Sequence, residues 1–124
     1  MIRRIDHINI ATEKLDETRD FFINVLGFEV GPRAEAPFPG YWLYAGGRAI
    51  VHLQLAKGPV TASSASALNH AAFEVDDLDA IAARLDRLGI EYRRIDMAGS
   101  PVRQLFLQDP NGVAVELNAP RPVR

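Results

Sequence analysis

The hydrophobic and polar positions of the first half alternate between two periods. Residues 2–10 alternate with a period of two, which predicts a strand. Apolar positions at helical spacing follow Thr12, which is suited to cap a helix, and Gly27 is suited to end that helix. Glycines and prolines then separate three further predicted strands, at residues 28–33, 41–46 and 49–55.

The second half of the chain repeats this order of elements. A strand is predicted over 69–75, followed by a helix that Asp76 or Asp77 caps and Gly89 ends. Three more strands are predicted, at residues 91–96, 102–108 and 113–118. The sequence DPNG at 109–112 is a strong hairpin signal between the last two strands.

The two halves also match residue by residue. The same 63-residue spacing separates His7 from His70 and Leu15 from Leu78. Such a frame indicates an internal duplication. We therefore predict an α+β fold of two βαβββ modules within one domain spanning 1–124. Its parts are module 1 (1–55), a linker (56–67), module 2 (68–118) and a short tail (119–124).

Alternation along the strands places all three histidines on one kind of surface. His7, His52, His70 and Glu116 are predicted on the sheet faces that no helix covers. If the modules pair by pseudo-two-fold symmetry, these four side chains converge. Imidazoles with one carboxylate suit one divalent transition metal ion such as Fe, Ni, Co, Zn or Mn. The alternative is three separately satisfied histidines and a surface glutamate.

Composition narrows the function classes. The 124 residues are 48% hydrophobic and 24% charged, with a net charge of −2, which gives no electrostatic support for binding nucleic acid. No cysteine is present, which excludes disulfides, thiolate metal sites and a cysteine nucleophile. The sequence contains no apolar run of membrane length and its first ten residues do not form a signal peptide. We expect a cytoplasmic protein that does not bind membranes.

Further polar and aromatic residues are candidates for contact with a small-molecule substrate. Asn9 and Gln54 share the uncovered face with the predicted ligands, and Tyr41 and Trp42 lie in an aromatic stretch. Arg103 is a candidate for an anionic substrate group, as are Arg33 and Arg48, with a solvated strand edge as the alternative for each arginine.

The sequence resembles the vicinal oxygen chelate superfamily, which includes glyoxalase I, fosfomycin-resistance, extradiol dioxygenase, methylmalonyl-CoA epimerase and bleomycin-resistance proteins. The resemblance rests on DHINI (6–10), LGF (26–28) and FLQDPNGVAVELN (106–118). It implies a glyoxalase-like fold whose sheets form a cupped metal-binding barrel, completed by a homodimer with shared sites. It also implies that His7, His70 and Glu116 are metal ligands. His52 falls where glyoxalase I-like members have a second glutamate, and we expect it to be a fourth ligand.

The resemblance implies a metal that chelates two adjacent substrate oxygens and stabilises an oxyanion. The leading hypothesis is a metal-dependent lyase or isomerase of glyoxalase type that stabilises an enediolate-like intermediate. Glu116 or His52 would move the proton. The alternatives are an Fe(II) extradiol-type dioxygenase, a fosfomycin-type thiol transferase and a metal-free small-molecule binding protein of the bleomycin-resistance kind.

Overall fold

The two sheets of the protein have the same topology. A computed structural model describes residues 1–121, and the chain divides into two compact units, Met1–Val60 and a second that begins at Thr61. The sheets have strand orders β1-β4-β3-β2 and β5-β8-β7-β6. In each sheet the first strand pairs with the last in parallel, and the other pairs are antiparallel. The predicted α+β fold with a repeated βαβββ order is confirmed.

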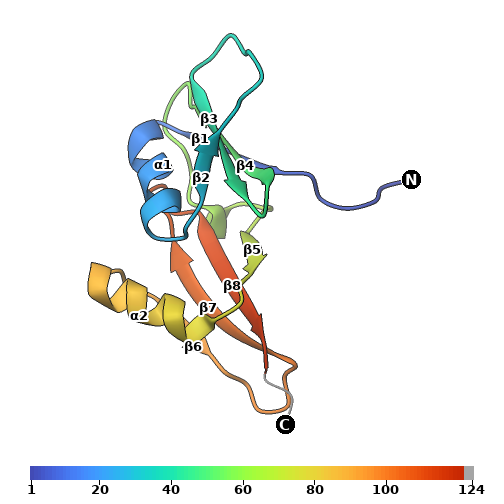
Figure 1. Cartoon of the computed structure of the whole chain (residues 1–124). Helices are drawn as coiled ribbons and strands as arrows, with labels where there is room; N and C mark the ends of the chain where they lie inside the picture. The colour runs from blue at the N-terminus through green and yellow to red at the C-terminus, as the bar shows by residue number, and fades with distance from the viewer. Residues whose placement is uncertain (122–124) are drawn as a thin grey trace. The chain divides into compact units, whose positions relative to one another are not determined.

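The elements of the first unit are β1 (Ile8–Thr12), α1 (Leu15–Asn24), β2 (Glu29–Gly31), β3 (Gly40–Ala45) and β4 (Arg48–Leu55) (Figure 1). The second unit contains a short 3₁₀ turn, Ser63–Ala65, followed by β5 (His70–Glu74), α2 (Leu78–Leu88), β6 (Arg93–Ile95), β7 (Val102–Gln108) and β8 (Ala114–Pro120). None of the helices within residues 1–121 is long and apolar enough to cross a membrane.

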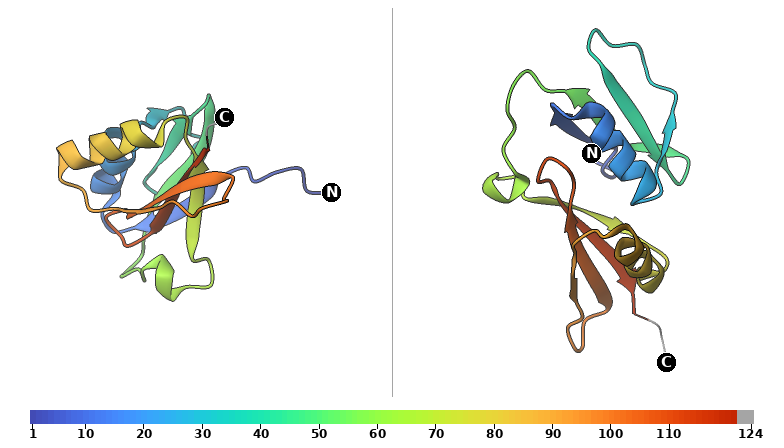
Figure 2. Two further views of the ribbon diagram at one scale, coloured as in Figure 1. Left: turned by 90° about the horizontal axis from the view of Figure 1, so that it is seen from below. Right: turned by 90° about the vertical axis from the view of Figure 1, so that its left-hand side faces the viewer.

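Each helix packs on one face of the sheet in its own unit and leaves the other face uncovered (Figure 2). The covered face carries the core, because alternate strand residues are fully buried there. In the first unit the core contains Phe22 of α1, Leu43 of β3, and Val51 and Leu53 of β4. The corresponding residues of the second unit are Leu85, Leu107, Val115 and Leu117. We call the uncovered side of each sheet its open face.

The start of the first unit differs from the prediction. The strand predicted over 2–10 begins only at Ile8, where pairing with β4 begins opposite Val51, and it continues to Thr12 opposite Leu55. Since Thr12 is extended and fully buried in the strand, it does not cap the helix. Its hydroxyl instead accepts a hydrogen bond from the Lys14 N–H (2.8 Å). The predicted Thr12 cap is therefore wrong.

The ends of α2 follow the sequence closely. Asp77 is its N-cap, and the carboxylate accepts a hydrogen bond from the Ala80 N–H (3.0 Å). Gly89 ends the helix in the left-handed conformation (φ 67°), which glycine adopts without steric strain. The strong signals at both ends explain why this helix is found where the sequence predicts it.

The segments expected to be a linker and a tail contribute bonds to the second unit. The Ser63 hydroxyl accepts a hydrogen bond from the Ala114 N–H (2.7 Å) at the start of β8. At the other end, β8 continues two residues beyond the predicted strand, to Pro120. Arg121 then donates to the Ser100 carbonyl (2.9 Å) and pairs with Asp96. Residues 122–124 of the predicted tail lie outside the described residues.

Candidate metal and substrate site

A row of three side chains crosses the open face of the first unit. His52 of β4 lies between its register partners, Asn9 of β1 and Trp42 of β3. Because neighbours on adjacent strands point to the same face, all three are directed away from α1. This register places Asn9 and His52 on the uncovered face, as alternation predicts, and Trp42, for which the sequence predicted no face, lies with them.

The imidazoles of His7 and His52 are stacked on each other. Their ring centroids are 3.7 Å apart and their planes differ by 8°. The indole of Trp42 stacks on His52 with a centroid separation of 4.2 Å and an angle of 15°. His52 is thus the middle ring of three. A metal ion lies in the plane of an imidazole that binds it, so two parallel rings at this separation do not bind one ion together.

The two ring nitrogens of His52 have different environments. Nε2 lies 3.1 Å from the Ala49 carbonyl oxygen, which only accepts, so Nε2 carries the hydrogen and Nδ1 is the acceptor. Partial burial lowers the pKa of His52, and the nearby charges of His7 and Arg33 lower it further. His52 is therefore a neutral imidazole at pH 7, with the proton on the nitrogen that faces the backbone.

His7 and His70 have the opposite arrangement, and they resemble each other. Nδ1 of His7 bonds the Asp6 carboxylate (2.7 Å), and Nδ1 of His70 bonds the Asn69 side-chain oxygen (3.0 Å). Each bond orients the ring and leaves Nε2 as the acceptor. Imidazoles that ligate metals are typically held in this way, with the second nitrogen donating to a carboxylate or carbonyl oxygen. The hydrogen bond from His7 lowers the pKa of the Asp6 carboxyl.

On the open face of the second unit, Glu116 of β8 lies beside His70. Its Oε1 is 3.8 Å from Nε2 of His70, and its side chain is only 12% exposed. Two donor atoms each about 2.1 Å from one ion are at most about 4.2 Å apart, so this separation is compatible with a shared metal. Oε2 of Glu116 accepts a hydrogen bond from the Asn118 amide (2.9 Å), which fixes the carboxylate.

The donor set of these residues fits a divalent metal in part. His70 and Glu116 offer one imidazole nitrogen and one carboxylate oxygen, and His7 offers a second imidazole nitrogen from the first unit. Within residues 1–121 no cluster of three or more potential ligands is assembled. The side-chain oxygen of Asn118, Oδ1, is buried without a hydrogen-bond partner within the described chain, so one acceptor beside Glu116 is left without a hydrogen bond.

The predicted substrate-binding residues fall into two groups. Trp42, Asn9 and Gln54 lie on the open face of the first unit, where the Asn9 amide donates to the Gln54 side-chain oxygen (2.8 Å). Tyr41 points to the opposite side, because its register partner is the buried Leu53. Its hydroxyl donates to Asp16 of α1 (2.6 Å), which raises the pKa of Tyr41.

Arg103 likewise lies on the covered side of its sheet. Its register partner is the buried Ala119, and its guanidinium pairs with Asp79 of α2 (3.2 Å) and Asp96 (3.5 Å). The positive charge of the guanidinium is thus balanced by two carboxylates of the protein itself. Tyr41 and Arg103 are thus bound to carboxylates on the helix side of their sheets, so we propose neither as a substrate contact.

Sequence reasoning did not single out several residues that support the site. Asp6 and Asn69 each directly precede one of the two aligned histidines, and this shared position could have identified them from the sequence. Asn118, in contrast, follows from alternation, because it lies two residues after Glu116 on the same face of β8. Phe106 is the register partner of Glu116 and lies beneath the Arg93 guanidinium, 5.6 Å from ring centroid to Cζ.

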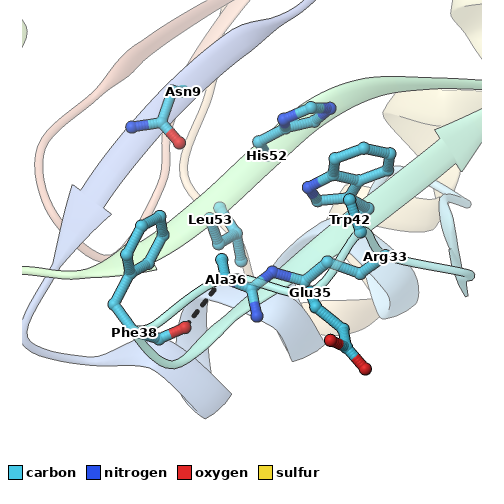
Figure 3. A pocket seen from close by; sticks show the side chains of 9 residues that line it. Asn9, Arg33, Glu35, Ala36, Phe38, Trp42, His52 and Leu53 are labelled. Atoms are coloured by element: carbon cyan, nitrogen blue, oxygen red, sulfur yellow. Dashed lines mark hydrogen bonds between the residues drawn. The ribbon is translucent and has the colours of Figure 1, made fainter.

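A pocket of about 170 Å³ opens beside His52 (Figure 3). Asn9, Trp42 and His52 line it from the sheet, together with Leu53. The loop between β2 and β3 supplies the remaining lining residues, which are Arg33, Ala34, Glu35, Ala36 and Phe38. The row of open-face residues is therefore one wall of a small cavity that combines aromatic rings with one guanidinium.

Comparison with known proteins agrees with the fold. The family model described as "Glyoxalase/Bleomycin resistance protein/Dioxygenase superfamily" matches residues 4–117. The chain belongs to this superfamily. The predicted resemblance to the vicinal oxygen chelate proteins is thereby confirmed.

Two curated relatives extend over most of the chain. "Glyoxylase I 4" from Arabidopsis thaliana is 32% identical over 120 residues, covering 91% of this chain and 68% of the relative. The mitochondrial methylmalonyl-CoA epimerase of Bos taurus is 28% identical over 127 residues, covering 92% of this chain and 73% of the relative. Homologues of this chain thus include enzymes.

Solved structures show the same fold. A protein from Bacillus anthracis assigned to the glyoxalase family has a TM-score of 0.82 and 27% identity, and the match covers 98% of both chains. The fosfomycin resistance protein FosX from Listeria monocytogenes, as an E126Q mutant complexed with Mn(II) and 1S,2S-dihydroxypropylphosphonic acid, has a TM-score of 0.77. It is 19% identical, and the match covers 98% of this chain and 95% of FosX, so it shows likeness of fold alone.

Proposed function

We propose that the protein is a metal-dependent lyase or isomerase of glyoxalase type, acting on a small oxygenated substrate. The observation that carries the proposal is the matched orientation of His7 and His70, each held through Nδ1 by the preceding residue so that Nε2 is the acceptor. The relatives named "Glyoxylase I 4" and methylmalonyl-CoA epimerase support this reaction class. The complex of FosX with Mn(II) supports a divalent metal ion in a protein of this fold.

We propose His7, His70 and Glu116 as the ligands of one divalent transition metal ion. Two of them belong to the second unit and lie within reach of one ion, while His7 comes from the first. We further propose that a homodimer with shared sites brings the two kinds of unit together. His52 was expected to be a fourth ligand, but its stacking on His7 and its Nε2 bond to Ala49 favour a different role.

A bound ion would act as a Lewis acid toward two adjacent substrate oxygens. The chain's own residues would then move the proton. We propose His52 and Glu116 as the two candidates for this proton transfer, since both face the uncovered side of their sheets. His52 is suited to accept a proton because its pKa is lowered and its Nδ1 is unprotonated at pH 7. Glu116 is held for the same task by the amide of Asn118.

Metal content paired with activity tests the proposal. The protein is reconstituted separately with Fe²⁺, Ni²⁺, Co²⁺, Zn²⁺ or Mn²⁺, and bound metal is measured. Each form is assayed on the methylglyoxal–glutathione adduct, on methylmalonyl-CoA by deuterium exchange, and on catechol with oxygen. We expect about one metal ion per chain and proton exchange or isomerisation on one of the first two substrates. Glu116→Gln should abolish the turnover, while Glu74→Gln, which changes a neighbouring open-face carboxylate, should retain it.

Two results would contradict the proposal. Less than about half an equivalent of any metal after reconstitution would exclude a metalloenzyme and favour a binding protein. Turnover of catechol alone, and only with Fe²⁺ and oxygen, would assign the protein to the dioxygenases instead.

A further inference from the structure

Arg33 is held at the pocket by contacts that fix its guanidinium. The residue lies in the loop between β2 and β3, and Nη2 donates to the Phe38 carbonyl oxygen (2.9 Å). Cζ lies 5.2 Å from the centroid of the Phe38 ring, a cation–π distance. A long and otherwise mobile side chain is thus restrained at the mouth of the cavity (Figure 3).

Gly40 makes room for this arrangement. A Cβ atom built at Gly40 would lie 2.8 Å from Nη2 and 3.2 Å from Cζ of Arg33. The guanidinium therefore lies directly against the backbone at the start of β3, where any larger residue would displace it. The absence of a side chain at Gly40 therefore leaves the space that the Arg33 guanidinium occupies.

The charge of Arg33 is not neutralised by the protein. Arg33 has no ion-pair partner within residues 1–121, whereas Arg19, Arg94 and Arg103 all pair with carboxylates. Glu35 also lines the pocket, but Figure 3 shows its carboxylate directed away from His52 and Asn9. The cavity thus presents an unpaired planar cation beside two aromatic side chains, Phe38 and Trp42.

We propose that this pocket binds the carboxylate of a small planar organic acid, with Arg33 pairing with the carboxylate and Trp42 and Phe38 packing on the flat apolar part. A single fixed guanidinium matches a singly charged, planar carboxylate through two parallel hydrogen bonds. A cavity of about 150 Å³ is enough to hold a benzene ring, and this pocket is of that size. The inference deepens the proposed function, on which it rests, by giving the substrate an anionic end near His52.

The single tryptophan of the chain provides a direct measurement, because Trp42 lines the pocket. Fluorescence of the full-length protein is titrated with benzoate and with its neutral analogue benzamide, in the presence of EDTA so that no metal binds the carboxylate. We expect saturable quenching by benzoate, with affinity that falls as salt is added. Arg33→Gln should weaken benzoate binding at least tenfold, and Arg33→Lys should weaken it less. Arg87→Gln, the same change on the exposed side of α2, should leave binding unaltered.

The inference is wrong if benzamide binds as tightly as benzoate, or if Arg33→Gln and Arg33→Lys both bind benzoate like the unaltered protein. Thermal melts of each variant exclude loss of the fold as the cause of weakened binding. The test is separate from that of the proposed function, because EDTA removes the metal. Failure of benzoate binding alongside metal-dependent turnover would reject only the carboxylate pocket, and benzoate binding without metal uptake would reject only the enzyme.

Discussion

Nε2 of His70 lies 3.8 Å from Oε1 of Glu116, with the far side of each group held by its own hydrogen bond. Asn69 holds Nδ1 of the imidazole, and Asn118 holds the second carboxylate oxygen. The two ligand atoms are therefore pre-oriented toward the same region before any ion arrives. Such pre-orientation favours metal binding, because less side-chain freedom is lost when the ion binds.

The ligand assignment makes a prediction about which histidines matter for metal affinity. Substitution of His7 or His70 by Ala should weaken metal binding at least about 100-fold, because each removes a direct ligand. His52→Ala should change affinity by less than about tenfold, because its ring stacks on His7 and its Nε2 faces Ala49. Competition titrations with a chromophoric chelator measure these affinities. Equal losses for His52→Ala and His70→Ala would restore His52 to the ligand set.

Asn118 is expected to act on the metal through Glu116. Asn118→Ala should lower metal affinity about 10- to 100-fold, since the carboxylate loses the hydrogen bond that orients it. The same chelator competition measures the change. Gln108→Ala, at an exposed position of β7, is the matched control and should bind metal normally. An unaltered affinity in Asn118→Ala would show that Glu116 is oriented without it.

Acid should destabilise the second unit through Asp79. Hydrogen bonds from Arg103 and Arg94 lower the pKa of Asp79 to about 2. Since the folded-state pKa lies below the unfolded value of about 3.9, this contribution is present above pH 4 and is lost as the pH falls through about 2. Asp79→Asn should flatten the dependence of unfolding free energy on pH between 4 and 2, as measured by urea denaturation. Asp76→Asn should keep the slope of the unaltered protein, and the same slope in Asp79→Asn would contradict the assignment.

Gly40 should tolerate no side chain. A Cβ at this position would lie 2.2 Å from the Leu53 carbonyl oxygen, which is backbone and cannot rotate away. Gly40→Ala should therefore lower the free energy of unfolding by about 2 kcal/mol or more. Gly58→Ala is the control, because nothing lies within 4 Å of the added Cβ and its φ is not positive. Equal denaturation midpoints for the two variants would show that the backbone at Gly40 can shift.

Elements with strong local signals could be predicted from the sequence. α2 begins at the Asp77 cap and ends at Gly89, and β7 spans 102–108 as its alternation indicates. The faces of β4 and β8 also follow from alternation, because one side of each strand is buried under a helix. Ile2 and Ile5 lie within the strand predicted over 2–10 but are largely exposed, because pairing with β4 begins only at Ile8.

The parts that could not be predicted depend on contacts distant in the sequence. Alternation gives a residue's face but not its partner, so the attachment of Arg103 to Asp79 was not visible. The stacking of His52 between His7 and Trp42 likewise depends on strand register. Adjacent aromatic residues illustrate the same limit, since Tyr41 and Trp42 point to opposite faces of β3. The choice between them requires knowing which face the helix covers.

The equal register of the two sheets has an evolutionary consequence. Asn9–His52–Trp42 and Ala72–Glu116–Phe106 occupy corresponding rows, each crossing three strands of its sheet. After duplication one copy carries a carboxylate at the centre of the row, and the other carries an imidazole between an amide and an indole. Divergence between the copies at this row therefore required exchanges of side chains without any change of strand order. One ancestral backbone thus carries two different chemical surfaces.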